Sequence, residues 1–98
     1  MSLFKREHEG EIALREVLPN LPSDAFEMAR LWVNSERSYV GVAYKKEWPP
    51  ELLGSLLVES MYTAAAVVAA HTGLTEDEAL ERLWRGFDEE RERLKDGD

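Results

Sequence analysis

The chain contains two histidines, His8 and His71, and no cysteine. A histidine can act as a general base or a metal ligand, because its imidazole changes charge near neutral pH. No nucleophile or second ligand is spaced to act with His71, which ends the longest apolar segment of the chain. We therefore expect its imidazole to donate to a carbonyl at a helix end, where the helix dipole favours it. The alternative is a ligand-binding role.

The other motifs give little support to catalysis or cofactor binding. The absence of cysteine excludes thiolate catalysis and cysteine-based zinc or iron–sulfur sites. The segment His8-Glu9-Gly10-Glu11 has metal-capable side chains, but it lacks a second nearby histidine, and we expect a solvated charged segment. No glycine-rich phosphate loop and no Gly-x-Ser-x-Gly motif occurs. We predict no catalytic residue, no metal and no cofactor, and an enzyme is the least favoured class.

Carboxylates in the helical segments are expected to face solvent. A carboxylate buried among apolar residues could do acid–base work. A helical wheel, however, places Glu59 in a narrow polar band with Ser55 and Thr63, so we expect it to be solvated or paired with an arginine. The acidic cluster Asp88–Glu90 is likewise typical of a solvated helix face.

An aromatic group lies in a predicted β-hairpin. The runs 26–34 and 38–45 are rich in β-branched and aromatic residues and are separated by a polar turn. Alternation places Trp32, Arg30 and Tyr39 on one face. This group could bind a planar ligand or a partner protein, or it could form the seam of a homodimer. We favour the seam, because an isolated hairpin is marginally stable and needs a cover.

The element that must position these side chains is the apolar segment Pro50–His71. Pro50 suits the first helical position, since its missing N–H has no intrahelical partner there. The predicted helix is apolar on two sides and therefore needs two covers, one of which we expect to be a second copy. One side carries Leu53, Leu56, Leu57, Met61, Ala64, Val67 and Val68, and the other carries Val58, Tyr62, Ala65 and Ala69.

A transmembrane helix is the competing interpretation of this segment, because about 20 apolar residues suffice to span a bilayer. Glu59, Gly54 and the hydroxyl side chains argue against it, as does the lack of Lys or Arg directly after the segment. We predict no membrane association.

A second helix is predicted after Gly73, which we expect in the left-handed conformation that ends many helices. Thr75 is the expected N-cap, and Glu78 stands at capping-box spacing. Gly86 lies inside the helical pattern, and we expect a close approach of another backbone or ring to offset its low helix propensity. The predicted buried stripe is Ala79, Leu80, Leu83, Trp84 and Phe87.

The chain has 98 residues and a formal net charge of −8. Because phosphate neutralisation drives nucleic-acid binding, this acidity disfavours nucleic acids and anionic membranes. The first residues lack the apolar core of a secretory signal, so we expect a cytoplasmic protein. We expect residues 1–23 to be flexible with a possible short helix, 24–94 to form one α+β domain, and 95–98 to fray.

Three stretches carry a family resemblance: Asp24-Ala25-Phe26-Glu27, Leu31-Trp32-Val33, and Glu78 to Leu83 continuing as Arg85 to Glu90. Over roughly three quarters of its length, the chain resembles a small bacterial family of uncharacterised proteins of unknown function. The resemblance implies a small α+β domain and supplies no activity, substrate or catalytic residue.

These patterns predict a small two-layer α+β domain, with a β-hairpin packed on a long central helix and a second C-terminal helix. The expected function is a cytoplasmic homodimeric interaction module without nucleic-acid or membrane partners. Its interface candidates are Trp32, Tyr39, Val58, Tyr62 and Ala69. The alternative is a small-molecule binder with a pocket between hairpin and helices, near His71, Trp48 and Trp84.

Overall fold

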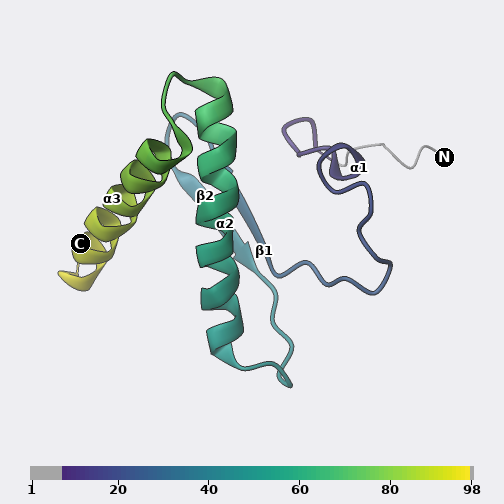
Figure 1. Ribbon diagram of the computed structural model, residues 1–98. Coiled ribbons are helices and arrows are strands. Elements are labelled where there is room, and N and C mark those ends of the chain that lie inside the picture. Colours follow the sequence, from purple (N-terminus) through teal and green to yellow (C-terminus); the bar gives the residue numbers. More distant parts are fainter. Residues whose placement is uncertain (1–7, 98) are drawn as a thin grey trace. The chain divides into compact units, whose positions relative to one another are not determined.

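The computed structural model describes residues 8–97, which form three helices and two strands (Figure 1). This content confirms the predicted α+β class. Their order along the chain is α1 Leu14–Val17, β1 Ala29–Val33, β2 Ser38–Val42, α2 Pro50–His71 and α3 Glu76–Lys95.

The chain divides into two compact units. The hairpin unit, Met1–Ala43, holds α1 and both strands, and the helical unit, Tyr44–Asp98, holds α2 and α3. Packing of the hairpin on the central helix would join these units and stays a prediction. The flexibility predicted for residues 1–23 and the fraying predicted for 95–98 fall partly outside the described residues.

The hairpin forms where the sequence predicts it, with shorter strands. Trp32 pairs with Tyr39 and Arg30 with Gly41 in an antiparallel register. The side chains of Arg30, Trp32 and Tyr39 therefore share a face, as expected. Asn34 holds the turn, because its Oδ1 accepts hydrogen bonds of 2.9 Å from the backbone N–H groups of Glu36 and Arg37.

Helix α2 begins at Pro50 and ends at His71, as predicted. Thr72, rather than Gly73, ends it: the Thr72 backbone is extended at φ −135° and ψ −177°. The Thr72 hydroxyl donates to Val68 O at 2.8 Å and accepts from Leu74 N–H at 3.1 Å. The left-handed conformation expected at Gly73 is therefore wrong, and among residues 8–97 it occurs only at Gly97, with φ 82°.

Helix α3 begins with the predicted capping box. The backbone N–H of Glu78 donates to Thr75 Oγ1 at 3.1 Å, and the N–H of Thr75 donates to Glu78 Oε1 at 2.8 Å. The hydrogen bond from the Thr75 backbone, followed by that from its hydroxyl, lowers the pKa of Glu78. Near the other end of α3, Arg93 pairs with Glu90, which lowers the pKa of Glu90 through their hydrogen bond.

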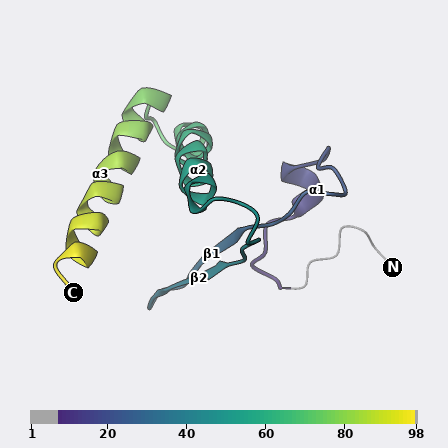
Figure 2. The ribbon, with the colours of Figure 1, turned by 90° about the horizontal axis from the view of Figure 1, so that it is seen from below.

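The two long helices pack against each other near their link and diverge away from it (Figures 1 and 2). Their buried side chains among the described residues are Ala65, 3% exposed, and Ala79, 1% exposed. Ala65 was expected on the outer strip of α2, which is wrong. Phe87, expected in the buried stripe of α3, is 43% exposed. The close neighbour expected at Gly86 is absent among residues 8–97, since a Cβ there would meet no heavy atom within 4 Å.

Candidate functional site

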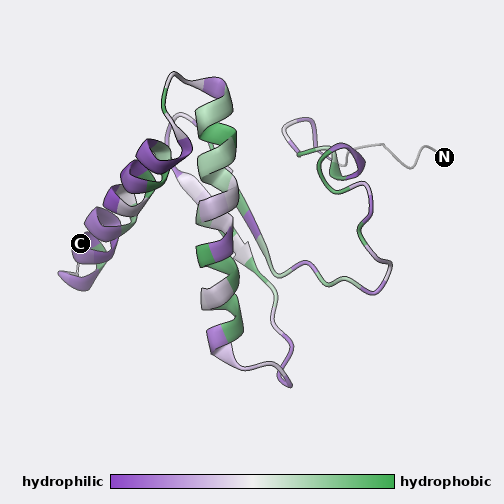
Figure 3. Ribbon diagram, in the orientation of Figure 1, coloured by the Kyte–Doolittle hydropathy of each residue, from purple (hydrophilic) through white to green (hydrophobic). Residues whose placement is uncertain are grey.

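The first candidate site is the part of α2 that α3 leaves uncovered. On the side in view, Figure 3 shows α2 as largely hydrophobic with some hydrophilic positions, and α3 as mostly hydrophilic. Val58 and Tyr62 lie one turn apart and are 42% and 58% exposed. Together with the exposed Gly54 and Ala66 they form one line at four-residue spacing, which we call the α2 row.

The outer strip expected from the sequence is narrower than predicted. Val58 and Tyr62 are exposed, whereas Ala69 is half-buried and Ala65 is buried. The divergence of α3 from α2 gives the reason: α3 lies close to α2 only near the link that joins them. The open apolar surface is therefore concentrated around the middle of α2.

The predicted ligand-binding residues do not come together. Trp48 precedes the first turn of α2 and His71 ends its last turn, so about 30 Å of helix separates them. The structure therefore does not bring these two side chains together, and a ligand-binding role for either of them stays a prediction. His71 Nδ1 lies 2.9 Å from Val67 O, the helix-end arrangement expected for this residue. Trp84 packs edge-to-face on Phe87, with ring centroids 5.5 Å apart.

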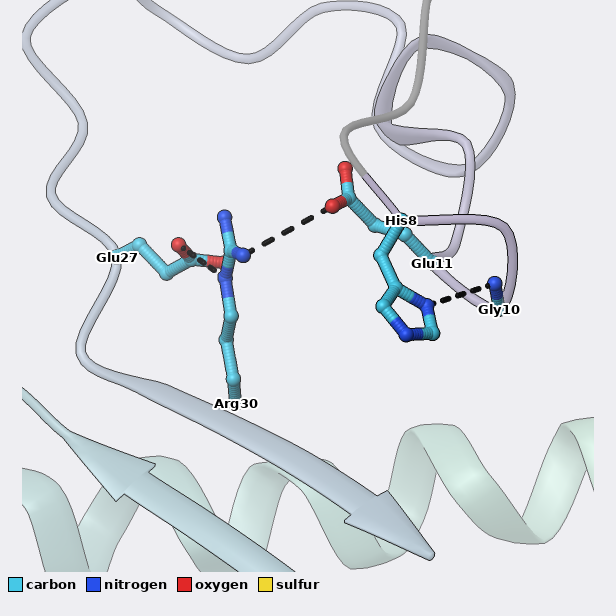
Figure 4. Close-up of polar contacts among 5 residues, drawn as sticks. All are labelled: His8, Gly10, Glu11, Glu27 and Arg30. Carbon is cyan, nitrogen blue, oxygen red and sulfur yellow. Dashed lines mark hydrogen bonds and ion pairs between the residues drawn. The ribbon is translucent and has the colours of Figure 1, made fainter. Parts of the chain in front are cut away.

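The second candidate site lies in the hairpin unit, around Arg30 (Figure 4). Arg30 Nε donates to Glu27 Oε1 at 2.8 Å, and Arg30 Nη1 lies 3.8 Å from Glu11 Oε2. The latter distance allows an ion pair but is too long for a hydrogen bond. Glu11 Oε2 is buried and has no hydrogen-bond partner, which is a costly arrangement for a carboxylate oxygen.

Trp32 of this face is contacted from within its own chain. The His8 ring packs edge-to-face on it at 4.9 Å, and His8 Nδ1 accepts a hydrogen bond of 3.0 Å from Gly10 N–H. The metal-capable N-terminal segment thus supplies a packing contact to the hairpin. Tyr39 remains exposed, with the Arg37 guanidinium 4.5 Å from its ring centre. The homodimer seam proposed for Trp32 and Tyr39 stays a prediction.

A cavity of about 680 Å³ lies in the hairpin unit, between the α1 region and β1, and we call it the α1–β1 cavity. Its volume falls within the usual range of small-molecule sites, about 300–1,000 Å³. Its wall is mainly apolar, and its charged members are Glu11, Glu27 and Arg30. The apolar lining is Ile12, Leu14, Val17, Leu18, Leu21, Ala25, Phe26, Ala29, Leu31 and Trp32, with Gly10 completing the wall. Sequence reasoning missed this site, because residues 1–23 were expected to be flexible.

Metal binding and membrane insertion are two further functions to consider for the described residues. Within residues 8–97, no cluster of three or more His, Asp or Glu side chains is arranged to hold a metal ion. In the same part of the chain, α2 is the one helix long and apolar enough to cross a membrane, by length and composition only. The core helix of a soluble protein can be equally long and apolar, so length and composition do not assign α2 to a membrane.

Comparison with known families places the chain in a group defined by sequence. Residues 19–95 match the family described as domain of unknown function (DUF5076). The chain belongs to the DUF5076 family. The match includes both strands and both long helices, and it begins after Glu11 and α1. No curated protein and no solved structure matches the chain.

Membership of DUF5076 agrees with the resemblance to an uncharacterised family. The bacterial origin expected from that resemblance stays a prediction. The family description assigns no activity.

Proposed function

We propose that this DUF5076 chain is a small cytoplasmic interaction module that forms a homodimer through α2. The exposed α2 row carries the proposal. Helix α2 is apolar on two sides, apart from a narrow polar band that includes Glu59, and within the helical unit α3 covers it only near their link. Burial of this apolar surface against a partner would stabilise the complex, by about 25 cal/mol for each Å² removed from water.

The position of the α2 row favours a second copy as the partner. Val58 and Tyr62 flank residue 60, close to the middle of the 22-residue helix. In a two-fold, antiparallel crossing at this point, Val58 of each copy meets Tyr62 of the other. Gly54 then meets Ala66, and these small residues allow the helix backbones to approach. The row is thus complementary to itself, as an isologous interface requires.

Sedimentation equilibrium of the full chain tests the proposal. We expect the wild type to be a dimer at micromolar concentration and Tyr62→Glu to weaken association by about tenfold or more, because the new carboxylate loses its hydration in the interface. Thr63→Glu is the matched control, since it adds the same charge at an exposed neighbouring position outside the α2 row. A monomeric wild type, or an equal effect of both variants, contradicts the proposal.

A membrane is the other surface that could cover α2, and flotation with neutral phosphatidylcholine vesicles separates the two. Our proposal expects the wild type to remain in the protein fraction as a dimer. Recovery of monomeric chain with the vesicles would overturn the proposal and assign α2 to the bilayer. The vesicles are neutral, so the net charge of −8 on the chain does not repel it from them.

A further inference from the structure

We propose that the α1–β1 cavity binds a small organic amine, with its ammonium group at Glu11 and its apolar body among the aliphatic and aromatic side chains. The proposal concerns the hairpin unit alone. It therefore does not depend on dimerisation through α2.

The wall of the cavity determines the apolar part of the ligand. Aliphatic side chains from the α1 region face Phe26 and β1 residues, including Trp32, across about 680 Å³. Several of them are substantially exposed to solvent, among them Ile12, Val17 and Leu31. A hydrocarbon body in the cavity would remove this surface from water, and each buried methylene contributes about 0.8 kcal/mol.

The charged groups determine the polar end of the ligand. Glu11 and Glu27 together carry two negative charges against the single positive charge of Arg30, so the cluster retains a net negative charge. Arg30 Nε is hydrogen-bonded to Glu27, whereas Glu11 Oε2 is buried without a hydrogen bond. Glu11 lines the cavity, so a ligand that donates an N–H to its carboxylate would offset the cost of this unpaired oxygen.

A cation is favoured over a neutral donor for two reasons. A charged hydrogen bond to a carboxylate is about twice as strong as a neutral one. The wall also includes the aromatic side chains of Trp32 and Phe26, and the face of an aromatic ring attracts cations. An anion would be attracted by Arg30 alone and repelled by the carboxylates of Glu11 and Glu27, so the net charge of the wall disfavours it.

The residues that line the cavity lie partly outside the family match. Glu11 and α1 precede the DUF5076 match, whereas Arg30 and Trp32 lie inside it. The amine site is therefore completed by a segment outside the family region. We infer that it belongs to chains that carry such a segment, and is not a property of the DUF5076 region alone.

Isothermal titration of the full chain at pH 7 tests the site with three probes of the same skeleton: 4-phenylbutylamine, 4-phenylbutanol and 4-phenylbutyrate. We expect the amine to bind about tenfold or more tighter than the alcohol, and the acid to bind most weakly. In NMR spectra, the indole signal of Trp32 should shift on binding, and those of Trp48 and Trp84 should not.

Glu11→Gln should reduce the affinity for the amine to that for the alcohol. Glu16→Gln is the matched control, because Glu16 belongs to α1 but does not line the cavity, and it should bind like the wild type. No saturable binding of the amine, or binding of alcohol or acid as tight as that of the amine, overturns the proposal. The affinities of the three probes are compared on the wild type, so this test of the proposal does not depend on whether a variant folds.

Discussion

At the scale of single residues, hydroxyl groups decide where the two long helices stop and start. Thr72 ends α2 by donating to Val68 O and accepting from Leu74 N–H, and Thr75 starts α3 within the capping box. The capping box was predicted because its two members have a fixed spacing. The role of Thr72 was not, because a neighbouring glycine is the more common signal of a helix end.

The capping box predicts a pH dependence of stability. The hydrogen bonds from Thr75 lower the pKa of Glu78 in the folded chain. Glu78 should therefore stabilise the fold at pH values above its unfolded pKa, and this contribution should disappear as the pH falls through the lower folded pKa. Urea unfolding of the wild type and Glu78→Gln from neutral to acidic pH measures the difference, which should shrink on acidification. A difference that grows on acidification would contradict the assignment.

At the scale of elements, Gly86 is a weak point of α3 with no compensating contact among the described residues. A Cβ at this position would meet open space. We expect Gly86→Ala to raise the free energy of unfolding by about 1 kcal/mol, because alanine has the higher helix propensity. Chemical denaturation at low protein concentration measures the change.

Gly97 provides the contrasting control for this prediction. Its φ of 82° strains any residue with a Cβ, so Gly97→Ala should give no stabilisation. A loss of stability in Gly86→Ala would mean that another backbone or a bulky ring does approach α3 at this position.

The long helices and the hairpin could be predicted because their signals are local: a proline at the first turn, a capping box, and alternation on both sides of a polar turn. The strands proved shorter than their β-rich runs. The α1–β1 cavity could not be predicted, since α1 has only four residues and its partners lie on β1. The separation of Trp48 from His71 follows from the length of α2, which lies between them.

At the scale of the whole molecule, few side chains are removed from water. Among residues 8–97, the buried apolar residues are Met28, Ala65 and Ala79. A small chain with so modest a core gains stability from association.

We therefore expect the thermal midpoint of the wild type to rise with protein concentration, because association stabilises the folded state by mass action. The midpoint of Tyr62→Glu should depend on concentration much less. Differential scanning calorimetry of the wild type and Tyr62→Glu, over about a hundredfold range of protein concentration, measures both midpoints. A wild-type midpoint that is independent of concentration would argue against dimerisation.

The contact between His8 and Trp32 would be lost if the protein were shortened to its family region. Cutting the chain back to residues 19–95 would keep β1, β2 and both long helices, but it would delete the His8 imidazole that packs on the Trp32 indole and the Glu11 carboxylate 3.8 Å from Arg30. The shortened protein would present a bare tryptophan to solvent. We expect the shortened protein to aggregate more readily than the full chain. It would also lack part of the wall of the α1–β1 cavity, so ligand screens should use the full chain.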